Sequence, residues 1–262
     1  MVDKIDDILK KFETEKGIQI LYAVEAGSRS WGFESPDSDF DIRFIYKQKN
    51  SMKYLSLNDP KETIDGFSDD RLYDWQGWDI KKALKLLRQS NPSLLEWLYS
   101  PIVYFNGDGL FKKEAIELVE KHREGITKPL YHHYKSMAKS NYMKHIKDKD
   151  QVSCKKYLYV IRPAAMVFWL MNVKQRKVLE ITFDIIIEDI KTLISDELYE
   201  NILEVIKNKK QMLETDSCKR IKVIDNWLDG IIFDKSEHKF EGEAHQIEVD
   251  ECDKIFQTIL GF

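Results

Sequence analysis

Apolar residues follow two different periods along the first hundred residues. Those of residues 3–16 lie at helical spacing before Gly17, which predicts a helix with a glycine cap. One face of this predicted helix carries Ile5, Ile8, Leu9 and Phe12. Residues 18–24 are a short apolar and β-prone run, which indicates a buried strand, whereas residues 39–46 alternate between apolar and polar positions, which indicates a strand with two different faces.

The next sixty residues predict an excursion, a further strand and two helices. Residues 47–70 are polar and weakly patterned, which is typical of a long connection that contains at most a short helix. Residues 71–76 predict another strand. Helical spacing starts at Asp79, and a second helix begins after Asn91 and ends at Pro101.

Strand patterns almost vanish after about residue 107. Helices separated by short breaks are predicted over 110–123, 130–146, 153–171, 182–193, 196–214, 217–231 and 251–260. Turn residues at 106–109 mark the change of pattern. We therefore predict an α+β chain with two domains, a mixed sheet with helices over 1–106 and an all-helical domain over 107–262.

The composition narrows the class of protein. Hydrophobic residues make up 43% of the 262 residues, which excludes disordered and low-complexity classes. The longest apolar run, 164–171, is far shorter than the ~20 residues of a membrane span, so no membrane partner is expected. The acidic start predicts no signal peptide, and three cysteines without a CxxC pair favour neither disulfides nor zinc. These features predict a cytoplasmic protein and leave its oligomeric state open.

Positive charge is concentrated in one segment. Residues 128–180 contain twelve Lys or Arg and three Asp or Glu, although the whole chain has a net charge of −4. Such an asymmetry indicates either a segment that meets an anionic partner or a solvated basic helical surface.

One short segment combines residues that suit phosphate chemistry. Gly27-Ser28 is followed by ten residues and then by Asp39-Phe40-Asp41. Because the two aspartates are at i and i+2 of a predicted strand, their carboxylates share its polar face with Arg43. Two adjacent carboxylates require a cation, and Mg²⁺ suits hard oxygen ligands. Gly27 allows close approach to its backbone, and Ser28 offers a hydroxyl to phosphate oxygens.

Gly-Ser, ten residues and Asp-x-Asp resemble the signature of the nucleotidyltransferase superfamily related to DNA polymerase β. The segment 27–41 is similar to a bacterial and phage branch of that superfamily that is associated with RNA repair. Segments 77–84, 90–98 and 155–163 resemble the same branch. The resemblance extends over most of residues 18–170.

This resemblance implies a metal-dependent enzyme. In the superfamily, Asp39 and Asp41 would bind Mg²⁺ or Mn²⁺ together with a nucleoside triphosphate, most simply ATP. A third carboxylate on a neighbouring strand is implied, and two catalytic candidates remain open. Asp74 lies within the predicted strand and would be the third metal ligand. Asp79 begins a helix, where an N-cap is the alternative role.

Candidate nucleotide-binding residues come from both predicted domains. In the first they are Gly27, Ser28 and Arg29. In the helical domain, basic and aromatic residues at helical spacing would hold phosphates and stack on a base, namely Lys139, Tyr142, Lys156, Tyr159 and Arg162. Lys155, Tyr159 and Arg162 are expected on one polar face. The alternative is surface lysines with partly buried tyrosines.

The leading hypothesis is transfer of a nucleoside monophosphate to an acceptor hydroxyl. An RNA end is favoured by the basic segment and by the branch's association with RNA repair. A partner protein, modified as by AMPylating antitoxins, and a small molecule are the other acceptors considered. A non-catalytic nucleotide-binding module is the alternative to an enzyme, and the complete Gly-Ser and Asp-x-Asp set argues against it.

Overall fold

The computed structural model describes residues 2–173, 178–211, 217–236, 238, 240 and 244–262. The chain groups into two compact units. The first contains Met1–Ser30, Asp39–Arg123 and His245–Phe262, and the second contains Trp31–Ser38 and Glu124–Ala244. The division at residue 106 stays a prediction. In the structure, residues 107–123 and 245–262 group with the first unit, and residues 31–38 group with the second.

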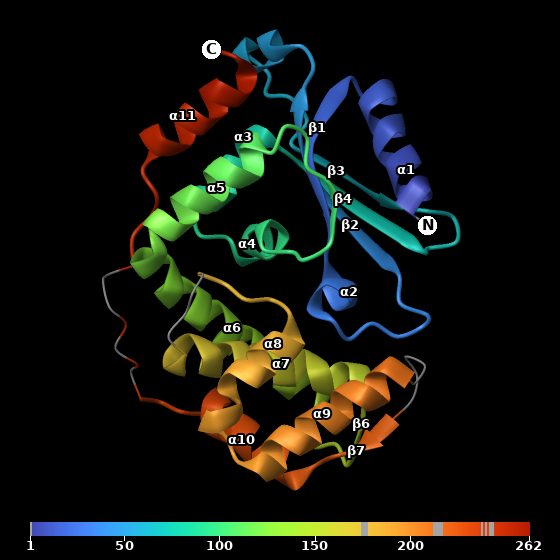
Figure 1. The fold of residues 1–262 in the computed structure, drawn as a ribbon, viewed down its shortest axis with the longest axis vertical. Helices are drawn as coiled ribbons and strands as arrows, with labels where there is room; N and C mark the ends of the chain where they lie inside the picture. Colours follow the sequence, from blue (N-terminus) through green and yellow to red (C-terminus); the bar gives the residue numbers. More distant parts are fainter. Residues whose placement is uncertain (1, 174–177, 212–216, 237, 239, 241–243) are drawn as a thin grey trace. The chain divides into compact units, whose positions relative to one another are not determined.

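The first unit is built on a mixed sheet with the strand order β3-β4-β2-β1-β5 (Figure 1). Its strands are β1 (Ile18–Glu25), β2 (Phe40–Gln48), β3 (Thr63–Phe67), β4 (Tyr73–Asp79) and β5 (Val103–Phe105). Strands β2 and β4 are parallel, and the other neighbours are antiparallel. The predicted α+β class is confirmed. The edge strands β3 and β5 were not predicted. Strand β3 interrupts its apolar residues with Asp65 and Gly66, and β5 has only three residues, too few to show a period.

The core of this unit lies between the sheet and α1 (Val2–Glu15). The predicted apolar face of the helix is buried there, and the ring of Phe12 stacks on that of Phe44 with centroids 5.6 Å apart. Gly77 on β4 makes room for this packing, since a Cβ at that position would lie 2.1 Å from the Phe44 ring.

Some of the remaining helices of the first unit begin at a residue whose side chain accepts a backbone N–H of the first turn. The remaining helices are α2 (Gly27–Trp31, whose last residue belongs to the second unit), the 3₁₀ turn η1 (Ser51–Leu55), α3 (Ile80–Arg88), α4 (Pro92–Leu98), α5 (Leu110–Lys121) and α11 (Val249–Leu260). The side chain of Asp79 accepts the Lys81 N–H at the start of α3. Asn91 caps α4 in the same way, and Pro92 occupies the first turn, where no N–H is needed.

The second unit is mostly helical, as predicted. It contains α6 (Arg123–His145, from Glu124 onward), α7 (Cys154–Asn172), α8 (Phe183–Ile190), η2 (Lys191–Leu193), α9 (Asp196–Gln211) and α10 (Lys222–Ile232). A two-stranded ribbon of β6 (Gln151–Ser153) and β7 (Ser217–Lys219) was not predicted. Helix α7 is buried on most of its surface.

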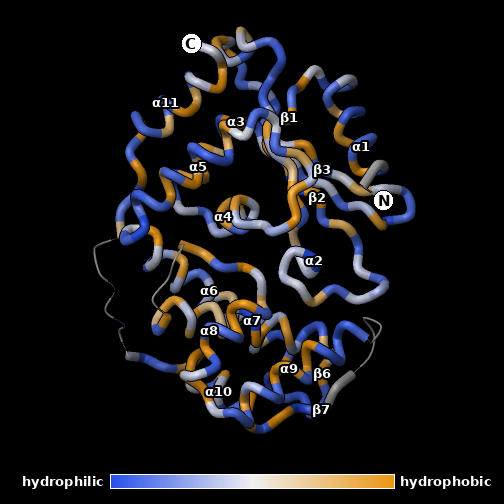
Figure 2. Tube along the Cα trace, viewed as in Figure 1, coloured by the Kyte–Doolittle hydropathy of each residue, from blue (hydrophilic) through white to orange (hydrophobic). Residues whose placement is uncertain are grey.

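Helices α5 and α11 each carry both hydrophilic and hydrophobic residues along their length (Figure 2). Within the described part of the chain, no helix combines the length and the apolar character that crossing a membrane requires.

Candidate functional site

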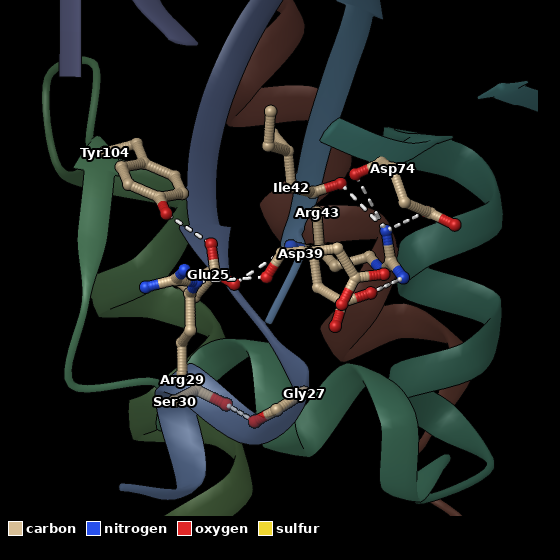
Figure 3. A network of polar contacts seen from close by, with 10 residues as sticks. Glu25, Gly27, Arg29, Ser30, Asp39, Ile42, Arg43, Asp74 and Tyr104 are labelled. Carbon is tan, nitrogen blue, oxygen red and sulfur yellow. Dashed lines mark hydrogen bonds and ion pairs between the residues drawn. The ribbon is translucent and has the colours of Figure 1, made fainter. Parts of the chain in front are cut away.

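Two neighbouring parallel strands bring the candidate carboxylates together. Asp41 and Asp74 are direct register partners on β2 and β4, and Asp39 immediately precedes β2. Asp39 is exposed, whereas Asp41 is partly buried. The three side chains therefore lie at the same end of two adjacent strands (Figure 3).

Gly27 allows the Asp41 carboxylate to lie against the turn after β1. The φ of Gly27 is +63°, and a Cβ built on it would lie 2.0 Å from Asp41 Oδ2. The Ala26 N–H donates to the Asp41 carbonyl at 2.9 Å, which ties the turn to the strand. The sequence suggested that a ligand approaches this glycine, and in the structure the Asp41 side chain does so.

Arg43 joins two of the carboxylates. Its Nη2 lies 2.7 Å from Asp41 Oδ1, and its Nη1 lies 2.7 Å from Asp74 Oδ1 (Figure 3). The sequence placed Arg43 on the polar face of the strand but assigned it no role. Its spacing from Asp41, at i+2 on a strand, was the available signal.

Glu25 is a buried carboxyl group that the sequence analysis did not select. It ends β1, accepts the Asp41 N–H at 2.9 Å and accepts the hydroxyl of Tyr104 (Figure 3). Burial raises the pKa of Glu25 to about 7, and these two hydrogen bonds only partly offset the rise. A charged residue at the end of an otherwise apolar strand was the sequence signal that could have identified it.

The first turn of α2 supports the same strand end. Arg29 Nε donates to the Asp39 carbonyl at 3.0 Å, and its guanidinium lies 3.9 Å from the centroid of the Phe40 ring. The Ser30 hydroxyl donates to the Gly27 carbonyl at 2.9 Å. Ser28 is partly exposed in this turn. The contacts of Arg29 fix the backbone from which the Asp39 carboxylate projects.

Asp79 lies at the opposite end of β4. It pairs in register with Tyr46, is buried, and caps α3 through the Lys81 N–H. The Tyr54 hydroxyl donates to Asp79 Oδ2 at 2.8 Å. Burial raises the pKa of this carboxyl group. These contacts correspond to the N-cap alternative for Asp79. Its place at the other end of the strand keeps it away from Asp41.

The donor chemistry of the strand end fits a divalent cation. Asp39, Asp41 and Asp74 supply hard carboxylate oxygens, and the guanidinium of Arg43 places a positive charge between two of them. Among the described residues, no group of three or more His, Cys, Asp or Glu side chains is already spaced to hold a metal ion. Asp41 and Asp74 are instead oriented toward Arg43.

The family model of the RNA repair pathway DNA polymerase beta family matches residues 1–258. The chain belongs to this family. This match confirms the resemblance to the DNA polymerase β superfamily, and to its branch associated with RNA repair, that the sequence motifs indicated.

Two further proteins are similar to this member of the family. An uncharacterized protein, YcgL, of Bacillus subtilis (strain 168) is 35% identical over 231 residues, which cover 87% of this chain and 84% of YcgL. A crystal structure of a nucleotidyltransferase-like protein from Exiguobacterium sibiricum 255-15 covers 100% of this chain and 80% of that protein, with 12% identity and a TM-score of 0.32. At these values the structural likeness is weak.

The second unit holds the other predicted nucleotide-binding residues, and it places them in different surroundings. Lys139 is exposed on α6, whereas Tyr142 on the same helix is buried with its ring edge against Phe233, at a centroid distance of 5.5 Å. Burial raises the pKa of Tyr142, as does its hydrogen bond to Asp229. The two residues therefore do not form a common exposed surface.

On α7, the basic residues also differ in their exposure to solvent. Lys156 is partly exposed, with Nζ 5.2 Å from the centroid of the Tyr159 ring. Arg162 is only 3% exposed, and its guanidinium lies 4.0 Å from the centroid of the Trp31 ring. The Trp31 ring also lies 6.3 Å from that of Tyr159, centroid to centroid, so Tyr159 and Arg162 share a face of α7 as expected. That face is covered at Arg162 and does not offer the guanidinium to solvent.

The loop before Asp39 is fastened by a lysine that the sequence analysis did not select. Lys209 on α9 is 1% exposed, and its Nζ donates to Ser35 Oγ at 2.6 Å. The Ser35 N–H donates to Ser38 Oγ at 3.0 Å, which closes the loop on itself. Because 174 residues separate Lys209 from Ser35, a sequence pattern could not identify the contact.

Proposed function

We propose that this member of the RNA repair pathway DNA polymerase beta family is a metal-dependent nucleotidyltransferase. It moves a nucleoside monophosphate from a nucleoside triphosphate, with ATP as the expected donor, to an acceptor hydroxyl. The observation that carries the proposal is that Asp39, Asp41 and Asp74 lie at one end of two adjacent strands, with the Asp41 carboxylate against Gly27.

The carboxylates are the catalytic and metal-binding residues of this proposal. Asp39 and Asp41 would hold Mg²⁺ or Mn²⁺, and a bound metal supplies charge neutralisation at the triphosphate and a lowered pKa of the attacking hydroxyl. Glu25 and Gly27 hold Asp41 in place, through its backbone N–H and by leaving space for its carboxylate. The Ser28 hydroxyl would donate to a phosphate oxygen in this proposal, and Arg29 fixes the Asp39 backbone.

Asp74 is the better candidate for the third carboxylate. It is the register partner of Asp41, and its side chain is 46% exposed, so substrate and metal can reach it. Asp79 is buried at the other end of the strand and already has two hydrogen-bond donors. The structural role of Asp79 is therefore sufficient to account for an aspartate at that position.

An RNA end is the acceptor that we favour. The family description refers to RNA repair, and the segment 128–180 is strongly basic within an acidic chain. In the second unit, Lys139 and Lys156 have the exposure that a phosphate contact needs. Burial of Tyr142 and Arg162 favours a role in packing, and the side of Tyr159 that faces Lys156 remains a candidate for stacking.

The test is transfer of an α-labelled nucleotide. The protein is incubated with Mg²⁺ or Mn²⁺ and each α-labelled triphosphate, with total RNA and protein lysate in separate reactions. Asp41→Asn is the inactive variant, and Asp59→Asn is the matched control, since Asp59 is an exposed aspartate that pairs with Lys81. Label in the RNA fraction that requires Asp41 supports the proposal. Label in protein would replace RNA as the acceptor, and no label in either fraction would contradict transfer to a macromolecule.

A further inference from the structure

Arg43 occupies the place where two of the proposed metal ligands face each other. Its guanidinium bridges Asp41 and Asp74, with an N–O distance of 2.7 Å on each side. The two aspartates are register partners on parallel strands, so without a cation their charges would repel at short range. The positive charge of Arg43 therefore offsets the repulsion between the two carboxylates, as a bound metal ion would.

The arginine also accounts for the spacing of the carboxylates. No described group of three acidic, histidine or cysteine side chains has metal-binding spacing, even though Asp39, Asp41 and Asp74 share one strand end. Each hydrogen bond from Arg43 fixes one carboxylate oxygen in the direction of the guanidinium. A cation that binds both aspartates competes with Arg43 for the negative charge of these carboxylates.

We propose that Arg43 is a built-in counter-cation that is exchanged for the metal ion. In the metal-free protein it holds Asp41 and Asp74, and metal binding releases its guanidinium from them. This inference rests on the proposed function, since it takes the metal site at Asp39 and Asp41 as given.

The surroundings of Arg43 permit the exchange. The Asp74 side chain is about half exposed, so it can turn away without leaving a charge buried. Arg43 Nη1 also donates to the Ile42 carbonyl at 3.1 Å, a backbone acceptor that stays available when the carboxylates leave. Among the described residues Asp39 forms no salt bridge, and its exposed carboxylate gives an incoming cation a first ligand.

Exchange has a consequence that a purely structural arginine would not have. If Arg43 and the metal compete for the same carboxylates, removal of the guanidinium must tighten metal binding while it destabilises the metal-free protein. An arginine that only supports the fold would destabilise the protein without tightening metal binding. The two effects are measured separately.

The experiment measures Mn²⁺ binding to the full chain without nucleotide, by the electron paramagnetic resonance signal of free Mn²⁺. Arg43→Gln is expected to bind Mn²⁺ about tenfold more tightly than wild type, which is ~1.4 kcal/mol. Arg43→Lys keeps a cation but loses the planar fork that reaches both carboxylates, so its Mn²⁺ affinity is expected to lie between those of wild type and Arg43→Gln. Lys81→Gln is the matched control, because it also removes one positive charge and a 2.7 Å ion pair, with Asp59, but at the other end of β4.

Thermal unfolding supplies the second measurement. Without metal, Arg43→Gln should melt at a lower temperature than wild type. At equal Mn²⁺ concentration it should gain more stability, since a ligand stabilises in proportion to the logarithm of its concentration over its dissociation constant. Mn²⁺ affinity of Arg43→Gln equal to or weaker than that of wild type would overturn the inference.

The two proposals fail in distinguishable ways. If Asp41→Asn leaves Mn²⁺ binding to the protein unchanged, the metal site itself is wrong and the exchange falls with it. If Mn²⁺ binding and nucleotide transfer depend on Asp41 but Arg43→Gln gains no affinity, only the exchange is wrong.

Discussion

Replacement of Gly27 by alanine is the perturbation whose effect the structure defines most closely. The added methyl group lowers the free energy of unfolding for two reasons. A non-glycine residue in the left-handed region, at a φ of +63°, costs roughly 1–2 kcal/mol. The added Cβ would also lie 2.0 Å from Asp41 Oδ2, so the carboxylate must move, and overpacking of this kind costs typically about 1–3 kcal/mol.

Gly17→Ala separates the two penalties. Gly17 has the same φ of +63°, but its Cβ would have nothing within 4 Å. We therefore expect Gly17→Ala to lose only the backbone contribution, about 1–2 kcal/mol, and to keep full activity. Gly27→Ala should lose roughly 2–5 kcal/mol in total and reduce transfer at least ~10²-fold, because it displaces Asp41.

Urea unfolding and transfer of α-labelled nucleotide check this pair. The difference in the free energy of unfolding between the two variants isolates the contact with Asp41, because the backbone contribution is common to both. Equal destabilisation of the two variants, with transfer retained in Gly27→Ala, would refute the reasoning that Gly27 is needed to position Asp41.

Three further predictions concern the carboxylates and the basic helix. Asp74→Asn should abolish transfer with little loss of stability, whereas Asp79→Asn should keep transfer because Asn also caps helices. Transfer assays and urea unfolding of both variants check this, and the reverse pattern would move the catalytic role to Asp79. Since the pKa of Glu25 is raised to about 7, the folded protein holds a proton there that the unfolded chain loses above pH ~4.5. The metal-free protein should therefore lose on the order of 3 kcal/mol between pH 4.5 and 7 relative to Glu25→Gln, and parallel pH profiles of the two proteins would contradict the assignment. Lys156→Ala should weaken the binding of single-stranded RNA about tenfold without loss of stability, because one phosphate contact is lost, whereas Arg162→Ala should lose about 2 kcal/mol or more of stability. RNA titration and unfolding of both variants check this, and unchanged RNA affinity in Lys156→Ala would leave it a surface lysine.

The sequence predicted those parts of the site that depend on local spacing. Asp39 and Asp41 follow from the i, i+2 period of a strand, and the cap at Asp79 follows from the start of a helical pattern. The pairing of Asp41 with Asp74 depends on the parallel register of β2 and β4, which alternation within each strand does not determine. For the same reason, the bridging role of Arg43 could not be derived from its position alone.

Burial was the other property that the sequence did not reveal. Arg162 lies on a helix with a mixed pattern, and one of its contacts inside the unit is with the ring of Trp31, more than a hundred residues earlier. The sequence did not identify Glu25 as a site residue, because its carboxyl group is defined by hydrogen bonds with Tyr104 and with the Asp41 backbone that form only in the fold. The partners of both residues are distant along the chain, so their contacts could not be predicted from local spacing.

Comparison of ATP labelled at the α-phosphate with ATP labelled at the γ-phosphate tests the central claim most directly. With Mg²⁺ and RNA, wild type should transfer the α label to RNA and none of the γ label, and Asp39→Asn and Asp41→Asn should each reduce that transfer at least ~10²-fold, about 2.7 kcal/mol in the barrier. Both variants should keep the fold, since each replaces a carboxylate by an amide of the same shape. Transfer of the γ label alone, or α-label transfer that is unchanged in both variants, would contradict nucleotidyl transfer at this strand end.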